Sequence, residues 1–221
     1  MDIIEAMKER HSVRNYLNKP LAQDVIDALQ VEIANCNQES GLHIQLVINE
    51  PQAFQSRLAR YGKFSNVSNY IVMAGPKSPD LDELCGYYGE RLVLKAQMLG
   101  CHTCWVGLTY KKIPGAFELA KGEKLVIVIA LGYGATSGTP HKSKPLDVIG
   151  DIDGTSPDWY IKGIEAVALA PTAVNQQKFH FALKDDQVEA TPGRGFYTKV
   201  DLGIAKYHFE MATNKDRSLW I

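Results

Sequence analysis

The sequence predicts an α+β protein that forms one domain, and three observations lead to this expectation. Several segments place apolar residues three or four positions apart, as amphipathic helices do. Others alternate apolar with polar residues, or form short apolar runs, as strands do. No linker or low-complexity tract interrupts the 221 residues, so we expect a single domain over residues 1–221.

The first third of the chain predicts three helices and one strand. Residues 2–10 form a helix that Asp2 caps, and a second helix runs from about 21 to 35. Residues 42–48 alternate apolar and polar side chains, which predicts a strand, and Pro51 opens a short helix. The apolar residues that define these four elements are Ile3, Ile4 and Met7; Ala22, Val25, Ile26, Leu29 and Ile33; Leu42, Ile44, Leu46 and Ile48; and Phe54, Leu58 and Tyr61.

The middle of the chain predicts buried strands on either side of a long helix. Residues 70–74 form a buried strand, and a helix follows from about 81 to 99, ended by Gly100. Residues 105–108 form a short strand or a turn. The apolar run 125–131 is typical of a central strand that is buried on both faces.

The C-terminal third resembles the first third in outline. Residues 170–181 lead from a helix into a strand, as residues 34–44 do, and a further helix is predicted near 200–212. These similarities lead to the hypothesis of a weak internal duplication, with copies at about 21–100 and 158–213.

The composition excludes several classes of partner. With 24 basic and 25 acidic residues the net charge is −1, so we expect no nucleic-acid partner and no anionic membrane surface. No apolar run approaches the ~20 residues of a membrane-spanning helix. The first residues are acidic and amphipathic, unlike a signal peptide, and four cysteines suit free thiols in a reducing compartment. We therefore expect a cytoplasmic protein.

Two apparent motifs favour simpler interpretations. Cys101 and Cys104 have the spacing of a zinc knuckle or a redox dithiol, but no second pair exists to complete a zinc site, and the pair leads into an apolar run. We therefore expect core thiols and no metal. The glycine-rich segment 132–138 lacks the spacing of a phosphate-binding loop and opens no clear helix.

Basic residues occur on alternate positions at two places. Arg10, Ser12 and Arg14 would face one side of an extended segment, where two guanidinium groups and a hydroxyl suit a flat, anionic ligand. The alternative is a solvated basic turn. Lys142 and Lys144 also alternate, after a buried strand, and the two basic pairs could meet around one phosphate; surface lysines are the alternative.

Four segments spaced through residues 1–180 form a set of motifs. They are Arg10–Arg14; Leu99–Gly107; Ala130–Tyr133 with Lys142–Leu146; and Ala170–Gln177. Together they resemble the signature segments of the FMN-dependent nitroreductases, which read Arg-[Arg/His]-Ser-x-Arg/Lys, Leu-Gly-Leu-Gly-Thr-x-Trp-x-Gly, Gly-Tyr with Arg/Lys-x-Lys-Pro-Leu, and Ala-Pro-Ser-x-x-Asn-x-Gln. Several such motifs in one chain are much more specific than any one of them.

The order of these motifs is similar to that of the TM nitroreductase subgroup. In most of the family the Ala-Pro-Ser segment follows the second helix directly, but here Ala34–Ser40 occupies that place and lacks the proline. The matching segment lies late in the chain, at Ala170, and Lys178 and Phe179 replace the Pro-Trp that ends it elsewhere.

The resemblance implies a nitroreductase-like fold, with a central, mostly antiparallel sheet flanked by helices. It also implies an FMN cofactor, NADH or NADPH as the hydride donor, and a small-molecule acceptor such as a nitroaromatic or a quinone. The flavin carries the chemistry, so no catalytic side chain is expected. Family members hold the flavin at a subunit interface, which implies a homodimer; the internal duplication would instead let one chain supply both sides of a single site.

The resemblance also implies roles for individual residues. The expected flavin-binding residues are Arg10, His11 and Ser12 at the phosphate and ribityl chain; Arg14 at the pyrimidine edge; backbone amides of Trp105, Val106 and Gly107 near N5 and O4; Lys142 and Lys144 at the phosphate; and Pro171, Thr172, Ala173 and Asn175 on the opposite side. Two alternatives stay open: a flavin-binding protein without turnover, and an interaction domain without flavin.

Overall fold

The computed structural model describes all 221 residues, as seven α-helices, three short 3₁₀ helices and six strands. None of the helices combines the length and the apolar composition needed to span a bilayer. The elements in chain order are α1 (Ile3–Glu9), α2 (Gln23–Ser40), β1 (Gln45–Val47), η1 (Gln52–Phe54), α3 (Arg57–Tyr61), β2 (Asn69–Pro76), α4 (Leu81–Met98), β3 (His102–Val106), β4 (Glu123–Gly132), α5 (Leu146–Ile149), α6 (Asp158–Val167), η2 (Ala173–Asn175), β5 (Phe179–Lys184), β6 (Gln187–Pro192), α7 (Thr198–Thr213) and η3 (Arg217–Leu219).

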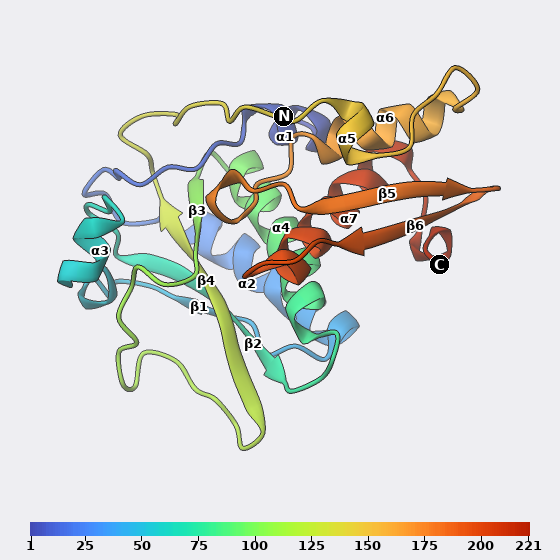
Figure 1. Ribbon diagram of the computed structural model, residues 1–221. Helices are drawn as coiled ribbons and strands as arrows, with labels where there is room; N and C mark the ends of the chain where they lie inside the picture. Colours follow the sequence, from blue (N-terminus) through green and yellow to red (C-terminus); the bar gives the residue numbers. More distant parts are fainter.

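The main sheet has four strands in the order β1-β2-β4-β3, and every neighbouring pair is antiparallel (Figure 1). Its central strand β4 is buried on both faces, as the apolar run predicts. Ile129 and Leu131 enter the larger hydrophobic core, whereas Val128 and Ala130 enter a second core on the other face. The expected α+β fold with a central antiparallel sheet flanked by helices is confirmed.

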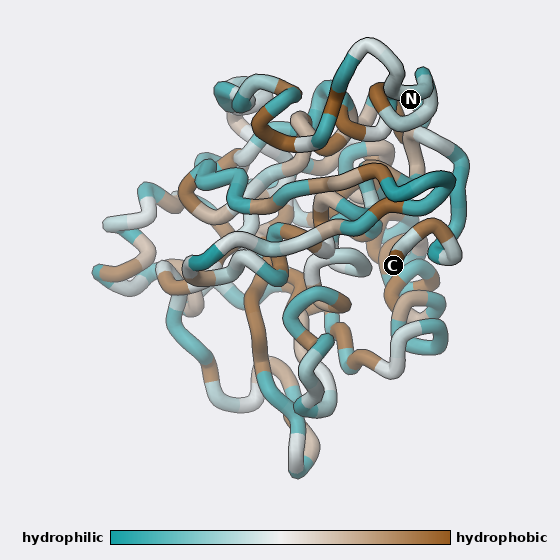
Figure 2. The backbone as a smooth tube through the Cα atoms, turned by 45° about the vertical axis from the view of Figure 1, so that its right-hand side comes forward, coloured by the Kyte–Doolittle hydropathy of each residue, from teal (hydrophilic) through white to brown (hydrophobic).

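Helices cover the face of the sheet that carries the larger core. That core joins 36 buried residues from the sheet, from α2, α4, α6 and α7, and from the C-terminal hairpin. The smaller core of 16 residues includes Val13 and Tyr16 of the N-terminal segment and residues of η1 and α3. Figure 2 shows most apolar stretches of the chain inside the molecule and hydrophilic stretches mostly in the outer loops.

Helices α4 and α7 pack in direct backbone contact, because each carries a glycine at the crossing. A Cβ atom at Gly86 would lie 2.0 Å from the carbonyl oxygen of Val200, and one at Gly203 would lie 2.0 Å from that of Glu83. Only glycine permits this approach. The crossing brings the helix that connects β2 to β3 of the main sheet against the helix that follows the C-terminal hairpin.

The hairpin β5–β6 forms a separate two-stranded sheet beside α7 (Figure 1). Its Phe181 stacks on Phe209 of α7, with ring centroids 5.9 Å apart and planes 4° apart, and Trp220 packs against both rings. Strand β5 begins within the predicted helix-to-strand segment 170–181. The sequence did not predict β6, in which Val188 is the only fully buried side chain.

Several predicted boundaries differ from the structure. Helix α2 continues to Ser40 instead of ending near 35, because Cys36 is buried one turn after Ile33 and Gly41 ends the helix at φ +70°. The strand predicted over 42–48 is only three residues long.

The short helix predicted after Pro51 is divided in two. Ser56 caps a new helix by accepting a hydrogen bond from the Ala59 amide, and Leu58 and Tyr61 are exposed. The predicted strand or turn at 105–108 begins earlier, since β3 spans His102–Val106. The long helix α4 and its end at Gly100, with φ +77°, are confirmed.

Candidate functional site

Two adjoining cavities lie beside the segment that precedes β5, and the apolar one of them is also lined by the edge strand β3. One has a volume of about 310 Å³ and is lined mainly by apolar side chains; we call it the apolar cavity. The other, the polar cavity, has a volume of about 500 Å³ and is lined mainly by polar and charged side chains. The two share Arg14, Pro171, Thr172 and Val174.

The N-terminal segment after α1 forms one wall of the polar cavity, and residues 10–15 all line it. The segment is held in place because the Val13 amide donates a hydrogen bond to the Thr103 carbonyl at 3.0 Å, and Ser12 forms a parallel bridge with Thr103. Val13 and Tyr16 are buried in the smaller core while Arg14 is exposed to the cavities. The structure thus brings Arg10, Ser12 and Arg14 together along one wall of the polar cavity.

Arg10 is a buried cation without an internal hydrogen-bond partner at its Nε. Its side chain is 4% exposed, and Nε is alone among the buried side-chain nitrogen and oxygen atoms in having no partner. Burial lowers the pKa of the guanidinium, and the Glu90 carboxylate, 3.8 Å away, opposes this shift. A buried charge is costly unless an opposite charge compensates it. The polar cavity therefore suits an anionic ligand.

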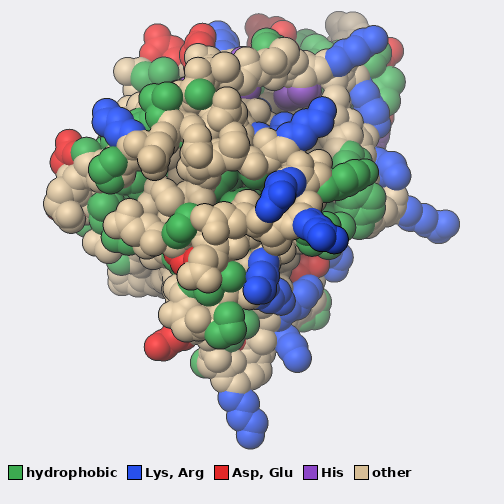
Figure 3. Space-filling view, turned by 90° about the vertical axis from the view of Figure 1, so that its left-hand side faces the viewer, with side chains coloured by type: hydrophobic (Ala, Val, Ile, Leu, Met, Phe, Trp, Pro, Cys, Tyr) green, Lys and Arg blue, Asp and Glu red, His purple; other side chains and the backbone are tan.

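Basic and histidine side chains gather around this cavity. Lys63, His11 and His141 line it together with Arg10 and Arg14. Figure 3, which views the molecule from the side on which α3 lies, shows Lys, Arg and His side chains on this face with few acidic ones among them. Despite the net charge of −1, the face around the cavity is positive.

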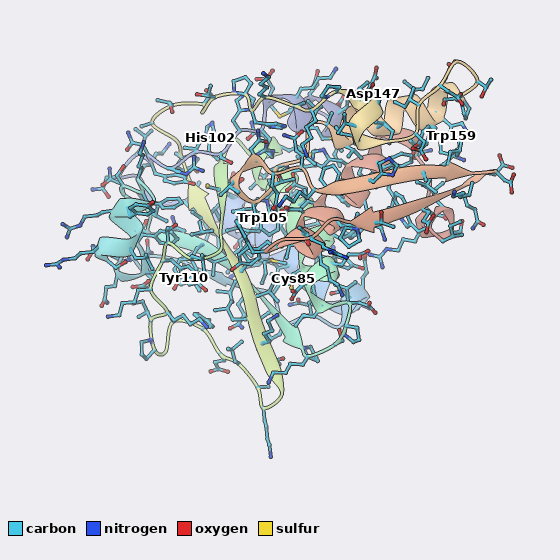
Figure 4. The ribbon with its side chains drawn as sticks, viewed as in Figure 1. Cys85, His102, Trp105, Tyr110, Asp147 and Trp159 are labelled. Carbon is cyan, nitrogen blue, oxygen red and sulfur yellow. The ribbon has the colours of Figure 1, made fainter.

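The apolar cavity begins where β3 ends. Trp105, Val106 and Gly107 line it, and Figure 4 shows Trp105 between the main sheet and the C-terminal hairpin. The Trp105 indole donates a hydrogen bond to the Glu90 carboxylate at 3.0 Å, which fixes the ring. Tyr197 closes the cavity from the start of α7: its hydroxyl donates to the Gly107 carbonyl at 3.1 Å, and a Cβ at Gly107 would lie 2.5 Å from its ring. This mainly apolar lining suits an aromatic group.

The segment Pro171–Asn175 forms the opposite wall of the two cavities, and the backbone from Val174 to Gln177 is strained. Val174, Asn175 and Gln177 have φ values of +47°, +55° and +43°, which side-chain-bearing residues rarely adopt. Such strain persists only where the surroundings enforce it, and it is concentrated at functional sites.

Asp201 of α7 enforces this conformation. Its carboxylate accepts hydrogen bonds from the Ala173 amide at 2.9 Å and from the Gln176 side chain at 2.7 Å. The carboxyl group is 2% exposed, and burial raises the pKa of Asp201 to about 6, although both hydrogen bonds oppose the rise. Asp201 thus fixes the wall at the cost of burying a carboxylate.

The structure does not bring Lys142 and Lys144 into either cavity. The Lys144 ammonium group donates to the Gln177 carbonyl at 2.8 Å, and the Lys142 carbonyl accepts hydrogen bonds from Asn175 and Gln177. Both lysines therefore support the strained wall from behind. A contact with a ligand phosphate would require this segment to move.

The other expected residues line the site. Of the 13 residues expected from the sequence, 11 line at least one cavity: Arg10, His11, Ser12, Arg14, Trp105, Val106, Gly107, Pro171, Thr172, Ala173 and Asn175. The sequence interpretation missed Lys63, His141, Tyr197 and Asp201. His141 directly precedes the Lys142 motif and could have been included, whereas nothing in the sequence distinguishes the other three.

The surroundings of the cysteine pair do not favour a metal site or a reactive thiol. Cys101 and Cys104 are free and buried, and burial raises the pKa of the Cys101 thiol to about 11. His102 between them accepts a hydrogen bond from the Gly134 amide at 3.1 Å. Nowhere in the structure are three His, Cys, Asp or Glu side chains arranged to hold a metal ion.

Comparison with known proteins identifies the family and the fold. The family model described as "Putative TM nitroreductase" matches residues 2–213, while none of the curated proteins matches this sequence. A "putative nitroreductase" from Thermotoga maritima has a similar structure, with a TM-score of 0.69 and 24% identity over 96% of this chain and 83% of the other.

Two Bacteroides structures are more distant. A "Putative NADH dehydrogenase/NAD(P)H nitroreductase" from Bacteroides thetaiotaomicron has a TM-score of 0.52 and 21% identity over 66% of this chain and 95% of the other. A nitroreductase with bound FMN from Bacteroides fragilis has a TM-score of 0.49 and 20% identity, over 71% of this chain and 97% of the other. Because the family model matches nearly the whole of this chain, the chain belongs to the TM nitroreductase family.

Proposed function

We propose that this protein is an FMN-dependent oxidoreductase that takes hydride from NADH or NADPH and reduces a small acceptor such as a nitroaromatic or a quinone. The observation that carries the proposal is the buried Arg10, whose Nε has no hydrogen-bond partner, in a polar cavity that shares a wall with an apolar one. FMN has the matching shape, because its phosphate and ribityl chain are polar and anionic and its ring system is flat and largely apolar.

The cofactor would extend over both cavities, and different residues would contact its polar and its aromatic parts. Arg10, His11 and Ser12 would hold the phosphate and the ribityl chain, and Lys63 adds a second cation on that side. Arg14 lines both cavities, so it suits the pyrimidine edge of the ring, where a positive charge favours reduced, anionic flavin.

Trp105, Val106 and Gly107 would lie beside the ring, and Pro171–Asn175 would limit water access from the other side. When bound, the flavin supplies the hydride and electron transfer itself. The chain's own residues bind the cofactor, orient it and shield it. This division of roles explains why the site needs no nucleophile and no acid–base pair.

We also propose that a single chain completes one flavin site. The expectation of a homodimer depended on a neighbouring chain that supplies the Pro171–Asn175 segment. Here the segment lines the same cavities as Arg14 within one chain. A homodimer would then contain two independent sites and would not be needed to build either of them.

The proposed activity is tested by absorption spectroscopy on the protein as purified. We expect the yellow absorption of oxidised flavin, and its bleaching under anaerobic conditions on addition of NADH or NADPH. A quinone or a nitroaromatic compound should then restore the colour. A flavin that neither nucleotide reduces would indicate a binding protein without turnover, and protein that stays colourless after incubation with FMN would indicate an interaction domain.

A further inference from the structure

Three ionisable side chains are buried together behind the polar cavity. Arg10 comes from the end of α1, Glu90 from α4 and His208 from α7, and their exposed fractions are 4%, 0% and 0%. Glu90 and His208 line neither cavity. Because an uncompensated buried charge costs several kcal/mol, the hydrogen bonds within this group decide which charge is neutralised.

The contacts of His208 require a proton between it and Glu90. Its Nδ1 lies 3.0 Å from the Ala166 carbonyl oxygen, which can only accept, so Nδ1 carries a hydrogen. Its Nε2 lies 3.0 Å from Oε1 of Glu90, a distance at which two lone pairs would repel each other. One proton therefore lies between these atoms. Whether nitrogen or oxygen holds it, the pair of His208 and Glu90 has no net charge.

Both oxygens of Glu90 are thereby engaged. Oε1 faces His208, and Oε2 accepts the hydrogen bond from the Trp105 indole at 3.0 Å. The Nε of Arg10 lies 3.8 Å from the same Oε1, beyond hydrogen-bond distance, and has no other partner. Because the pair of His208 and Glu90 is neutral as a whole, it compensates the Arg10 charge less than a bare carboxylate at 3.8 Å would.

We propose that His208 is a positioning residue: by sharing one proton with Glu90 it keeps that pair neutral, and this leaves Arg10 available to an anionic ligand. This inference rests on the proposed function, in which the ligand is the phosphate of FMN. Without His208, the Glu90 carboxylate would be a bare anion next to Arg10 and would compete with the phosphate. His141, whose Nε2 contacts the Ala168 carbonyl at 3.0 Å, is a further ionisable group close to Arg10, and it lines the polar cavity and has no hydrogen bond to Glu90.

The test compares FMN with riboflavin, which lacks the phosphate, on apoprotein variants. In His208→Gln the side chain stays polar but cannot hold the extra proton, so Glu90 becomes an anion that pairs with Arg10. We expect FMN affinity to fall at least about tenfold, the lower limit for a hydrogen bond between charged groups, and riboflavin affinity to change far less. Adding Glu90→Gln to this variant removes the competing carboxylate and should restore most of the FMN affinity.

The single variant Glu90→Gln tests the same claim if His208→Gln does not fold. Its amide can donate to His208 Nε2 and accept from the Trp105 indole, so the hydrogen bonds and the zero net charge are both retained. We expect the preference for FMN over riboflavin to be kept. A large loss of that preference would show that Glu90 acts as an anion that orients Arg10, and this would overturn the proposal.

His180→Gln is the matched control, because His180 also pairs with a carboxylate, that of Asp151 at 3.2 Å, but on the surface. It should bind both flavins as the natural chain does. If His208→Gln loses affinity for FMN and riboflavin equally, or if adding Glu90→Gln does not restore FMN affinity, the proposed role of His208 is wrong. The proposed function would not be affected by either result. A natural chain that binds neither flavin would overturn both.

Discussion

The two halves of the chain follow the same order of elements and build different sheets. In the N-terminal half, α2 leads to the antiparallel pair β1–β2 and then to α4. In the C-terminal half, α6 leads to the antiparallel pair β5–β6 and then to α7. The first pair extends into a four-stranded sheet because β4 pairs with β2, whereas the second remains a hairpin.

The two halves of the chain therefore supply different walls of the same site. The N-terminal half supplies the cationic wall at 10–15 and residues 105–107 of the apolar cavity, which follow from the pairing of β3 with β4 in the larger sheet. The C-terminal half supplies the opposite wall at 171–175, which α7 anchors. The internal duplication stays a prediction; the shared order of elements and the packing of α4 on α7 support it.

The largest effect is expected where the halves meet. In Gly203→Ala the new Cβ would lie 2.0 Å from the Glu83 carbonyl oxygen, so backbone must move and α4 and α7 must separate. Overpacking usually costs about 1–3 kcal/mol, and we expect about 3 kcal/mol or more here. Chemical denaturation followed by circular dichroism measures it. The control Gly154→Ala, whose Cβ would meet no atom within 4 Å, should stay within about 0.5 kcal/mol; equal losses would show that the crossing is not a tight contact.

The anchor of the C-terminal wall predicts a pH dependence. Because burial raises the pKa of Asp201 to about 6, the folded protein binds this proton more tightly than the unfolded chain, whose aspartate pKa is about 3.9. This group therefore lowers stability as pH rises from about 4 to about 6, by up to about 3 kcal/mol.

Asp201→Asn removes that titration and adds a constant offset from its altered hydrogen bonds. The free energy of unfolding of the variant, relative to the natural chain, should therefore increase between pH 4 and pH 7. Urea denaturation at the two pH values measures this change. A difference that is the same at both would mean that burial does not raise the pKa of Asp201 above its value in the unfolded chain.

A substitution in the cationic wall should weaken the binding of FMN, which carries a phosphate, more than that of riboflavin. Arg10→Ala removes a charge-assisted contact worth about 1.5–3 kcal/mol, so FMN affinity should drop at least about tenfold while riboflavin is less affected. Titration of apoprotein with each flavin measures both. Arg91→Ala is the control, since Arg91 pairs with Glu32 and Glu39 away from the cavities. Equal loss of both flavins in Arg10→Ala would place Arg10 away from the phosphate.

The smallest effect is expected at the junction of the two cavities. Arg14→Ala removes a positive charge beside the pyrimidine edge and should make the flavin reduction potential more negative by about 20–40 mV, or about 1–2 kcal/mol for a two-electron couple. Reduction by NADH or NADPH should slow accordingly. An unchanged potential with FMN fully bound would mean that Arg14 does not face the ring.

Regular elements were predictable where burial follows a simple period. The run 125–131 is apolar throughout because β4 has a core on each face, and Gly100 marks the end of α4 because that position has a positive φ. Strand β6 was missed because one buried residue, Val188, gives no period, and only its pairing with β5 makes it a strand. The break at Ser56 was missed because capping overrides a continuous helical pattern.

Site residues that belong to a sequence motif were predictable, whereas residues that reach the site only through tertiary packing were not. The alternate positions of Arg10 and Arg14 predicted that their side chains lie together, and the late Ala-Pro-Thr segment indicated the opposite wall. Asp201 and Tyr197 reach the site only because α7 packs on α4, which no local pattern encodes. Lys142 and Lys144 alternate as expected, yet their contacts go to the strained wall instead of the cavity.

The central claim is that one chain supplies both walls of a single flavin site, and the most direct test is the solution mass measured together with the number of FMN molecules per chain. Light scattering of the flavin-loaded protein, combined with release and quantification of the flavin, gives both values. We predict one FMN per chain, retained in a species of about 24.5 kDa. One FMN per two chains, or a dimer that loses its flavin when it dissociates on dilution, would contradict the claim.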